Sequence, residues 1–331
     1  MEKNDRPTEF DLIQTYFAPL AKSEAGAFDL TDDAAVLSIE QGREMVVTTD
    51  TIVSGVHFLN DTPAEAVAAK LLRVSLSDLA AMGATPHSYT LSLALTETIT
   101  GDWLSSFSAS LARDQDAYDI ILVGGDTVST PGPLTLTLTA IGTVLKGKAL
   151  RRNGAQEGDD VYVSGTIGDG ALGLLVALEE ISGLSNDAAE FLLDRYYYPQ
   201  SRGRLGEKLL GLAHAVADVS DGLAADLGQI CQPSGVSAVI HSSLVPLSNA
   251  AKAVLNQDSV YFQQILGGGD DYELIFTAAK SDGEMINDLS EEIGIQVRRI
   301  GSITAENDED VVIKDWAGEP MLLHHKGFRH F

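Results

Sequence analysis

Apolar runs that end in acidic and hydroxyl side chains recur along this chain. Met45 to Val47 form a short apolar run typical of a β-strand, and Thr48, Thr49 and Asp50 follow it directly. The segment 134–144 begins with alternating apolar and polar residues, which predicts a strand with one solvated face. Further strands are predicted at residues 90–95, 120–123, 161–164, 215–219, 236–240, 273–278, 297–300 and 311–313.

The clearest helix signal covers residues 62–82. Thr62, Pro63 and Glu65 form the pattern of a capping box with proline at the first helical position. Apolar residues then recur at helical spacing, and Asp78 lies on the same inward stripe, where it needs a salt bridge, a backbone cap or a metal ion. Other helices are predicted at residues 10–20, 102–118, 171–181, 186–195, 202–212, 223–231 and 247–255.

The order of these elements favours an α+β fold with mixed sheets. Strands and helices alternate in both halves, but several strand pairs are too close in sequence for a helical crossover between them. A length of 331 residues suits two domains. The stretch 145–160 is rich in Gly, Lys and Arg and has no periodicity, so we expect one domain at residues 1–148 and a second at 149–331.

The net charge of the chain limits the classes of molecule that it can bind. The chain has 48 Asp and Glu against 22 Lys and Arg, a formal net charge of −26. This field repels nucleic acid and anionic membranes, and it repels ATP unless cations intervene. The single cysteine, Cys231, excludes an intrachain disulfide and a cysteine-based zinc site. There is neither an N-terminal apolar segment nor a run of about 18 apolar residues, so we expect a cytoplasmic protein.

Carboxylates repeatedly stand beside Gly or Ser at the edge of an apolar run. They are Asp32-Asp33 before A-A-V-L, Asp50, Asp126 in L-V-G-G-D-T, Asp218 and Asp221 in A-D-V-S-D-G-L, and Asp270-Asp271 in G-G-G-D-D-Y-E, with Asp78 added from a helix. Hard oxygen ligands on rigid elements suit Mg²⁺. We interpret the set as one site around Mg²⁺ and a nucleotide phosphate chain, which indicates a small-molecule kinase. Each Asp alone also fits a turn or a cap, and Asp221 is a candidate N-cap.

Two glycine patterns point to other nucleotide folds but lack the required context. The segment 142–149, G-T-V-L-K-G-K-A, lacks the Ser/Thr magnesium ligand of a P-loop and is not followed by an apolar helix. The segment 168–173, G-D-G-A-L-G, matches G-x-G-x-x-G, but no second buried strand follows within about 30 residues, as a Rossmann unit requires. We interpret it as a glycine entry into a helix whose N-terminus faces a phosphate.

Seven segments together resemble one known family. In order, the chain contains T-T-D-T-I-V-S-G-V-H-F, V-S-L-S-D-L-A-A-M-G-A, G-G-D-T, A-L-R-R-N-G-A, G-D-D-V-Y-V-S-G-T-I-G-D, V-S-D-G-L-A-A-D-L and G-G-D-D-Y-E-L. They span most of the sequence and resemble the thiamine-monophosphate kinase family of the aminoimidazole ribonucleotide synthetase superfamily. The resemblance implies ATP- and Mg²⁺-dependent transfer of the γ-phosphoryl group to thiamine monophosphate, giving thiamine diphosphate. It also implies a homodimer whose N-terminal domain sheets form a barrel, with nucleotide held between the two domains.

The resemblance also implies a set of site residues. Metal ligands by position are Asp33, Thr48, Thr49, Asp50, Asp78, Asp126, Asp218 and Asp221. Nucleotide contacts are Gly125, Asp126, Arg152 and Ser220, and substrate contacts are His57, Asp270 and His325. We assign no general base, because the phosphate acceptor is already ionised near neutral pH.

Three positions depart from the family pattern. F-D-L-T-D-D replaces a glycine-rich approach to Asp33, Asp270 replaces a glutamate, and His325 stands where an aromatic residue is expected. Two alternatives stay open: another ATP-dependent enzyme of the superfamily, or a non-catalytic protein that binds divalent cations. No EF-hand loop supports the latter.

Overall fold

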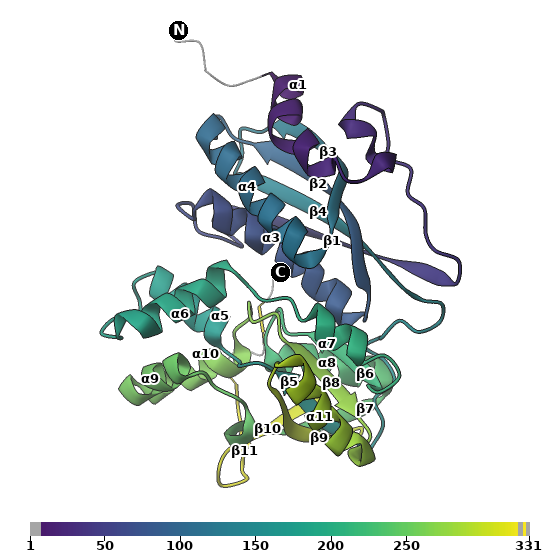
Figure 1. Cartoon of the computed structure of the whole chain (residues 1–331). Helices are drawn as coiled ribbons and strands as arrows, with labels where there is room; N and C mark the ends of the chain where they lie inside the picture. The colour runs from purple at the N-terminus through teal and green to yellow at the C-terminus, as the bar shows by residue number, and fades with distance from the viewer. Residues whose placement is uncertain (1–7, 324–326, 329–331) are drawn as a thin grey trace. The chain divides into compact units, whose positions relative to one another are not determined.

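The computed structural model describes residues 8–323 and 327–328, which form two compact units (Figure 1). The first unit comprises Met1–Leu79 and Thr85–Gly147, and the second comprises Ala80–Ala84 and Lys148–Phe331. Among the described residues, no helix is both long and apolar enough to cross a membrane.

The described part of the first unit is built on a four-stranded mixed sheet of order β1-β4-β2-β3. Its strands are β1 (Arg43–Val53), β2 (Thr85–Leu95), β3 (Ile121–Ser129) and β4 (Thr135–Leu145). β4 runs antiparallel to both neighbours, whereas β2 and β3 are parallel. Helices α3 (Ala64–Ala81) and α4 (Gly101–Tyr118) cover one face (Figure 1), and α4 is the crossover that a parallel pair requires. The predicted mixed α+β fold is thereby confirmed for this unit.

The two faces of this sheet differ in composition. Leu91, Leu93 and Leu138 are buried on the face that the helices cover. The opposite face carries threonines, and Thr49 pairs with Thr139 and Thr51 with Thr137 through hydroxyl contacts of 2.9 and 2.8 Å. Within the described chain, no helix of this unit lies over the threonine face, which we call the open face.

An N-terminal segment packs beside β3. It contains α1 (Glu9–Leu12), the π-helical η1 (Ile13–Phe17), α2 (Ala18–Ala21) and the 3₁₀ turn η2 (Ala25–Leu30), so the helix predicted at 10–20 is confirmed with a π turn inside it. Ala21 and Ala27 are buried against Val123. Phe28, Asp29 and Leu30 have φ angles of 51°, 54° and 57°, a left-handed backbone that glycine adopts with less strain. The replacement of a glycine-rich approach therefore leaves a strained entry to Asp33.

The described part of the second unit contains a seven-stranded sheet of order β11-β10-β7-β9-β5-β8-β6. Its strands are β5 (Asp160–Ser164), β6 (Ala215–Asp218), β7 (Val236–His241), β8 (Leu274–Ala278), β9 (Val297–Ala305), β10 (Val311–Lys314) and β11 (Pro320–Met321). Only β10 and β7 pair in parallel among these described strands.

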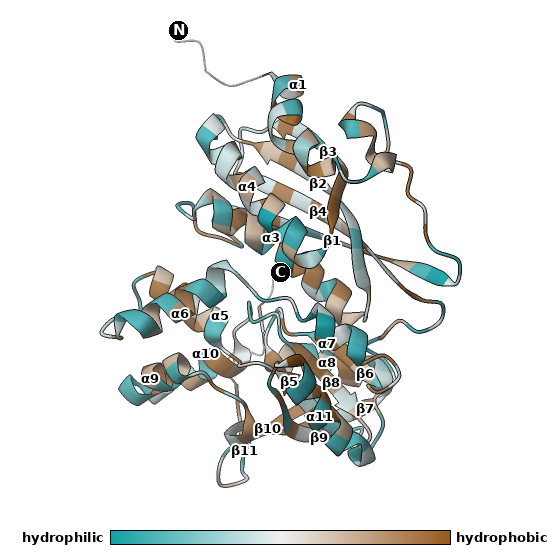
Figure 2. Cartoon of the chain, viewed as in Figure 1, coloured by the Kyte–Doolittle hydropathy of each residue, from teal (hydrophilic) through white to brown (hydrophobic). Residues whose placement is uncertain are grey.

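Both faces of this sheet are covered. One core lies under α5 (Asp169–Ala177), α6 (Asn186–Tyr197), α8 (Leu223–Ser234), α9 (Asn249–Gln257) and α10 (Phe262–Gly267). The other lies under α7 (Gly203–Lys208) and α11 (Gly283–Ile293). Alternation decides which residue enters which core: Val161 and Val163 join the first, and Tyr162 joins the second. Figure 2 shows hydrophobic colour along strands of this sheet and hydrophilic residues on α9 and α11.

Several local predictions need correction. The strands β1 and β3 continue through Asp50 and Asp126 instead of ending before them. The capping box is not formed: the described chain offers no hydrogen-bond partner to the buried hydroxyl of Thr62. The helices α10 and α11 and the short strand β11 were not predicted.

Candidate active site

Two carboxylates of the first unit meet between β1 and α3. Thr48 and Asp50 are two residues apart on β1 and share a face, while Ser75 and Asp78 are three apart on α3 and share a side of the helix. The hydroxyl of Thr48 donates to Asp78 Oδ2 at 2.5 Å, and the hydroxyl of Ser75 donates to Asp50 Oδ2 at 2.6 Å. We call these four residues the β1–α3 group.

The electrostatics of the β1–α3 group favour a cation. Burial and the negative charge of Asp78 together raise the pKa of Asp50 to about 6, although the Ser75 hydrogen bond opposes the rise. A bound cation relieves both penalties. The described residues contain no set of three or more His, Cys, Asp or Glu side chains placed to hold a metal ion. The two carboxylates and the Thr48 hydroxyl nevertheless fit Mg²⁺ chemically, because Mg²⁺ usually takes only one or two carboxylates and completes its shell with water and phosphate oxygens.

Thr49 lies apart from this group. Its hydroxyl donates to Leu138 O at 3.2 Å and contacts Thr139 on the open face. Because neighbouring residues of a strand point to opposite faces, its side chain lies across the sheet from Thr48 and Asp50.

Asp33 and Asp126 line a cavity of about 120 Å³ beside β3. The N-terminal segment supplies one wall, and β2 and β3 supply the other. Gly125 is necessary here, since a Cβ at that position would lie 2.0 Å from Leu91 O. The structure thus brings Asp33, Gly125 and Asp126 together.

The sheet separates Asp126 from Asp50. Asp126 pairs with Ser92, Ser92 with Thr137, and Thr137 with Thr51, so all four stand on one row across the sheet. Residues on one row point to the same face, which places Asp126 with Thr51 on the open face and opposite Asp50. β1 and β3 are also the two edge strands, three strand spacings or roughly 14 Å apart.

His57 follows a tight turn after β1. Gly55 has a φ of 78°, and the His57 amide donates to Val53 O at 2.9 Å, so the predicted glycine turn is present. The Val53 amide donates to His57 Nδ1 at 3.0 Å. Since Nδ1 accepts this bond, the neutral imidazole carries its proton on Nε2.

In the second unit, Asp218, Ser220 and Asp221 lie at the end of β6 and in the loop before α8. Asp218 is buried, whereas Asp221 is exposed. Asp221 is not the N-cap of α8, because Gly222 occupies that position. Instead, Asp226 Oδ2 accepts from the amides of Asp221 and Gly222, each at 3.0 Å.

Asp226 connects this loop to Arg152. Burial and the charge of Asp221 raise the pKa of Asp226 to about 7, although the neighbouring amides and the Arg152 guanidinium oppose the rise. Because the charge of Arg152 acts on Asp226, Arg152 lies near the loop that contains Ser220 and Asp221. The spacing of five residues from Asp221 to Asp226 in D-G-L-A-A-D was the signal for this cap in the sequence.

Asp270 lies in a loop bonded to the previous one. The Asp270 amide donates to Ser220 O at 2.9 Å, and the Tyr272 amide donates to Val219 O at 2.8 Å. The predicted sites at Arg152, Ser220, Asp221 and Asp270 are therefore neighbours within the second unit. His325 lies outside the described residues.

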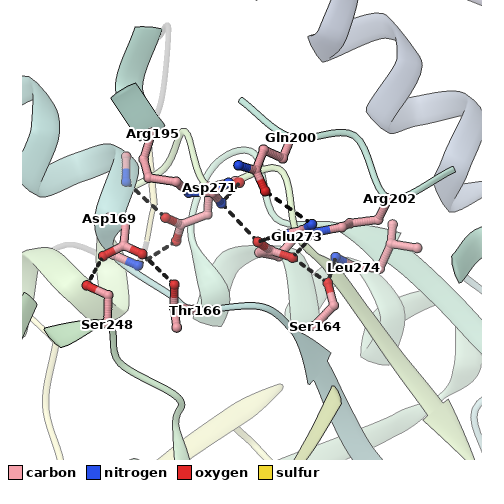
Figure 3. Close-up of polar contacts among 12 residues, drawn as sticks. Ser164, Thr166, Asp169, Arg195, Gln200, Arg202, Ser248, Asp271, Glu273 and Leu274 are labelled. Atoms are coloured by element: carbon pink, nitrogen blue, oxygen red, sulfur yellow. Dashed lines mark hydrogen bonds and ion pairs between the residues drawn. The ribbon is translucent and has the colours of Figure 1, made fainter. Parts of the chain in front are cut away.

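The glycine pattern at 168–173 begins α5, as predicted, with Gly168 as its N-cap. At the start of this helix Asp271 accepts from the amides of Gly168 at 2.7 Å and Gly170 at 3.1 Å, so these two amides are already occupied (Figure 3). β5 is antiparallel to both of its neighbours, so no Rossmann unit is present in the described structure.

Comparisons with known proteins agree with this architecture. Residues 31–144 match the N-terminal domain and residues 156–314 the C-terminal domain of the family described as AIR synthase related protein. The thiamine-monophosphate kinase of Escherichia coli (strain K12) is 39% identical over 324 residues, covering 98% of each chain. The chain belongs to the thiamine-monophosphate kinase family of AIR synthase related proteins.

Solved structures of this family are also similar. The thiamine-monophosphate kinase from Stenotrophomonas maltophilia K279a is 42% identical, with a TM-score of 0.80 over 88% of this chain and 91% of that one. AaThiL complexed with AMPPCP and TMP is 29% identical, with a TM-score of 0.76 over 93% of this chain and 98% of that one. Membership of the family is consistent with the motifs identified in the sequence, whereas Ser75 and Tyr272 emerge only from contacts in the structure.

Proposed function

We propose that this chain is a thiamine-monophosphate kinase, which transfers the γ-phosphoryl group of ATP to thiamine monophosphate with Mg²⁺ and forms thiamine diphosphate. The observation that carries the proposal is similarity over nearly the whole chain to enzymes of that name, at 39% and 42% identity. A kinase that consumes ATP works where ATP is kept, so we place the activity in the cytoplasm.

Thr48, Asp50 and Asp78 are the residues of the first unit best suited to hold Mg²⁺. Asp33, Asp126, Asp218 and Asp221 are proposed to share this role, and Thr49 only through its backbone carbonyl, because its side chain lies on the open face. A bound ion would supply positive charge that neutralises the phosphate chain during transfer. Arg152 supplies a planar fork suited to phosphate oxygens, while Gly125 and Ser220 offer close backbone contact to nucleotide.

The reaction needs no protein base. The acceptor is a phosphate oxygen already ionised near neutral pH, so direct in-line transfer requires only alignment and charge neutralisation. We propose that His57, Asp270 and His325 bind thiamine monophosphate. The 1–148 domain is then the metal, nucleotide and dimerisation domain, and the 149–331 domain completes the site.

Two features of the first unit support a homodimer. The open face exposes Met45 and Val47 at 49% and 56%, which is unusual for a face that remains in water. Asp126 and Asp50 lie on opposite faces and opposite edge strands of one sheet, so one copy alone keeps them apart. We propose that a second copy covers the open face, and that Asp126 acts together with residues of that copy.

A labelled-phosphate assay tests the function. The purified chain is incubated with γ-labelled ATP, Mg²⁺ and thiamine monophosphate, and we expect label in thiamine diphosphate with one ADP for each product. Free thiamine serves as a second acceptor, and a reaction without acceptor should leave the protein unlabelled. ADP formation without thiamine diphosphate would point to another enzyme of the superfamily, and no ADP at all would indicate a cation-binding protein.

A further inference from the structure

The loop of residues 268–273 has an unusual backbone. Asp270 and Tyr272 have φ angles of 70° and 53°, in the left-handed region that residues with side chains rarely adopt. Strain of this kind persists only where neighbouring contacts fix the chain, and it concentrates at functional sites.

Contacts on one side of the loop fix it to the body of the second unit. Asp271 and Glu273 are buried at 1% and 0% exposure. Asp271 caps the start of α5, and Glu273 accepts from Arg195 at 2.9 Å and from Arg202 at 2.6 and 2.5 Å (Figure 3). These are charge-assisted bonds in a site shielded from water, and they leave the backbone little freedom.

Contacts on the other side fix the same loop to the Ser220 loop. The backbone amides of Asp270 and Tyr272 donate to Ser220 O and Val219 O at 2.9 and 2.8 Å. A Cβ at Gly269 would lie 2.2 Å from Ser220 O, so the two backbones are in direct contact.

We call these two sets of contacts the clamp, and it holds the two strained residues, Asp270 and Tyr272, in place. Asp271 and Glu273 are buried, whereas Asp270 and Tyr272 alternate with them and are half-buried. The Tyr272 hydroxyl donates to Asp270 Oδ1 at 3.0 Å. The carboxylate of Asp270 is thus held both by its backbone and by a neighbouring phenol.

We propose that Tyr272 is a positioning residue, whose hydroxyl orients the Asp270 carboxylate toward the cationic or amino-bearing ring of the phosphate acceptor. The inference rests on the proposed function and adds a residue to it. A carboxylate attracts a cationic ring and repels a phosphate chain, so the Tyr272–Asp270 pair acts on the acceptor and not on ATP.

Steady-state kinetics of Tyr272→Phe test the proposal. Loss of a hydrogen bond to a charged group predicts a rise of roughly tenfold in KM for thiamine monophosphate, with KM for ATP changed less than about twofold. The melting temperature should stay within a few degrees of the parent, because the buried clamp remains intact. Tyr261→Phe, a half-buried tyrosine before α10, is the matched control and should leave both KM values unchanged.

A double-mutant cycle separates positioning from a structural role. Because Tyr272 acts through Asp270, the Tyr272→Phe/Asp270→Ala double variant should be no worse than Asp270→Ala alone. Additive losses, equal rises in both KM values, or an unchanged Tyr272→Phe enzyme would each overturn the inference while the parent remains an active kinase. A parent without thiamine diphosphate formation would instead overturn the proposed function.

Discussion

Asp50 in the first unit is a half-buried acid and Glu273 in the second is a fully buried one, and their partners differ in kind. Glu273 accepts from two arginines, Arg195 and Arg202, and from the Ser164 hydroxyl at 2.5 Å. Asp50 accepts from the Ser75 hydroxyl and has the negative charge of Asp78 beside it.

The difference separates a structural acid from a binding acid. Glu273 finds its compensating charge within the chain, which suits a permanent clamp. Burial and the charge of Asp78 raise the pKa of Asp50 more than the Ser75 hydrogen bond lowers it, so a cation from solution would favour the ionised form of Asp50. In this strongly acidic chain, the kind of partner therefore indicates whether an acid stabilises the fold or is suited to bind metal.

The largest expected effect is on catalysis by Asp50→Asn. Removal of a metal ligand at a phosphoryl-transfer site should lower kcat/KM by on the order of 1000-fold, because the ion supplies several kcal/mol of charge stabilisation. The fold should remain intact by circular dichroism. Asp116→Asn, an exposed acid on α4, is the control; activity of Asp50→Asn within about tenfold of the parent would remove Asp50 from the metal site.

Glu273→Gln should instead damage stability. The substitution leaves Arg195 and Arg202 without their buried counter-charge, a change that typically costs about 3–5 kcal/mol of unfolding free energy. Urea denaturation measures it. The exposed pair of Glu292 with Lys208 provides the comparison, and Glu292→Gln should leave the transition unchanged. Equal free energies of unfolding for the two variants would show that the contacts of Glu273 with Arg195 and Arg202 do not stabilise the fold.

Without metal, Asp50→Asn should be more stable than the parent at high pH. The folded pKa of Asp50 is about 6 against an ordinary value of 3.8, so its contribution to stability is fully present below pH 3.8 and is lost as pH rises through 6. The free energy of unfolding of the variant should therefore exceed that of the parent by on the order of 2 kcal/mol at pH 8 and should equal it near pH 3.5. Denaturation in chelator at both pH values checks this, and a gain independent of pH would contradict it.

The serine partners give the smallest and most selective contrast. Ser75→Ala and Ser164→Ala each remove one hydroxyl that donates to Asp50 or Glu273. Each should cost about 1–3 kcal/mol of stability. We expect Ser75→Ala alone to lower kcat/KM, by roughly tenfold, because only its partner binds metal. A similar kinetic loss in both variants would remove the distinction between the two acids.

The sequence contained most of the fold. Alternation over 134–144 predicted β4, helical spacing predicted α3 and α4, and close strand pairs predicted mixed sheets. Strand ends were less accessible: Asp50 and Asp126 continue β1 and β3, because ladder hydrogen bonds to the neighbouring strands outweigh the weak strand propensity of Asp and Gly.

The sequence predicted which residues belong to the candidate site but not where their side chains lie. Motifs identified Thr49, Asp50 and Asp126 together, yet pairing register places Thr49 and Asp126 on the open face and Asp50 under α3. Register depends on contacts between distant strands, which no local pattern specifies. The hydrogen bond from Tyr272 to Asp270 likewise depends on left-handed backbone angles that the sequence does not predict.

The most direct test of the central claim is the Mg²⁺ dependence of unfolding for the parent and for Asp50→Asn at pH 8. Binding to the folded state stabilises a protein by roughly 1–3 kcal/mol at 10 to 100 times Kd. We predict that Mg²⁺ raises the melting temperature of the parent and removes the advantage that Asp50→Asn has in chelator. An equal rise in both proteins would show that the ion binds elsewhere and would contradict the assignment of Asp50 and Asp78 as a metal site.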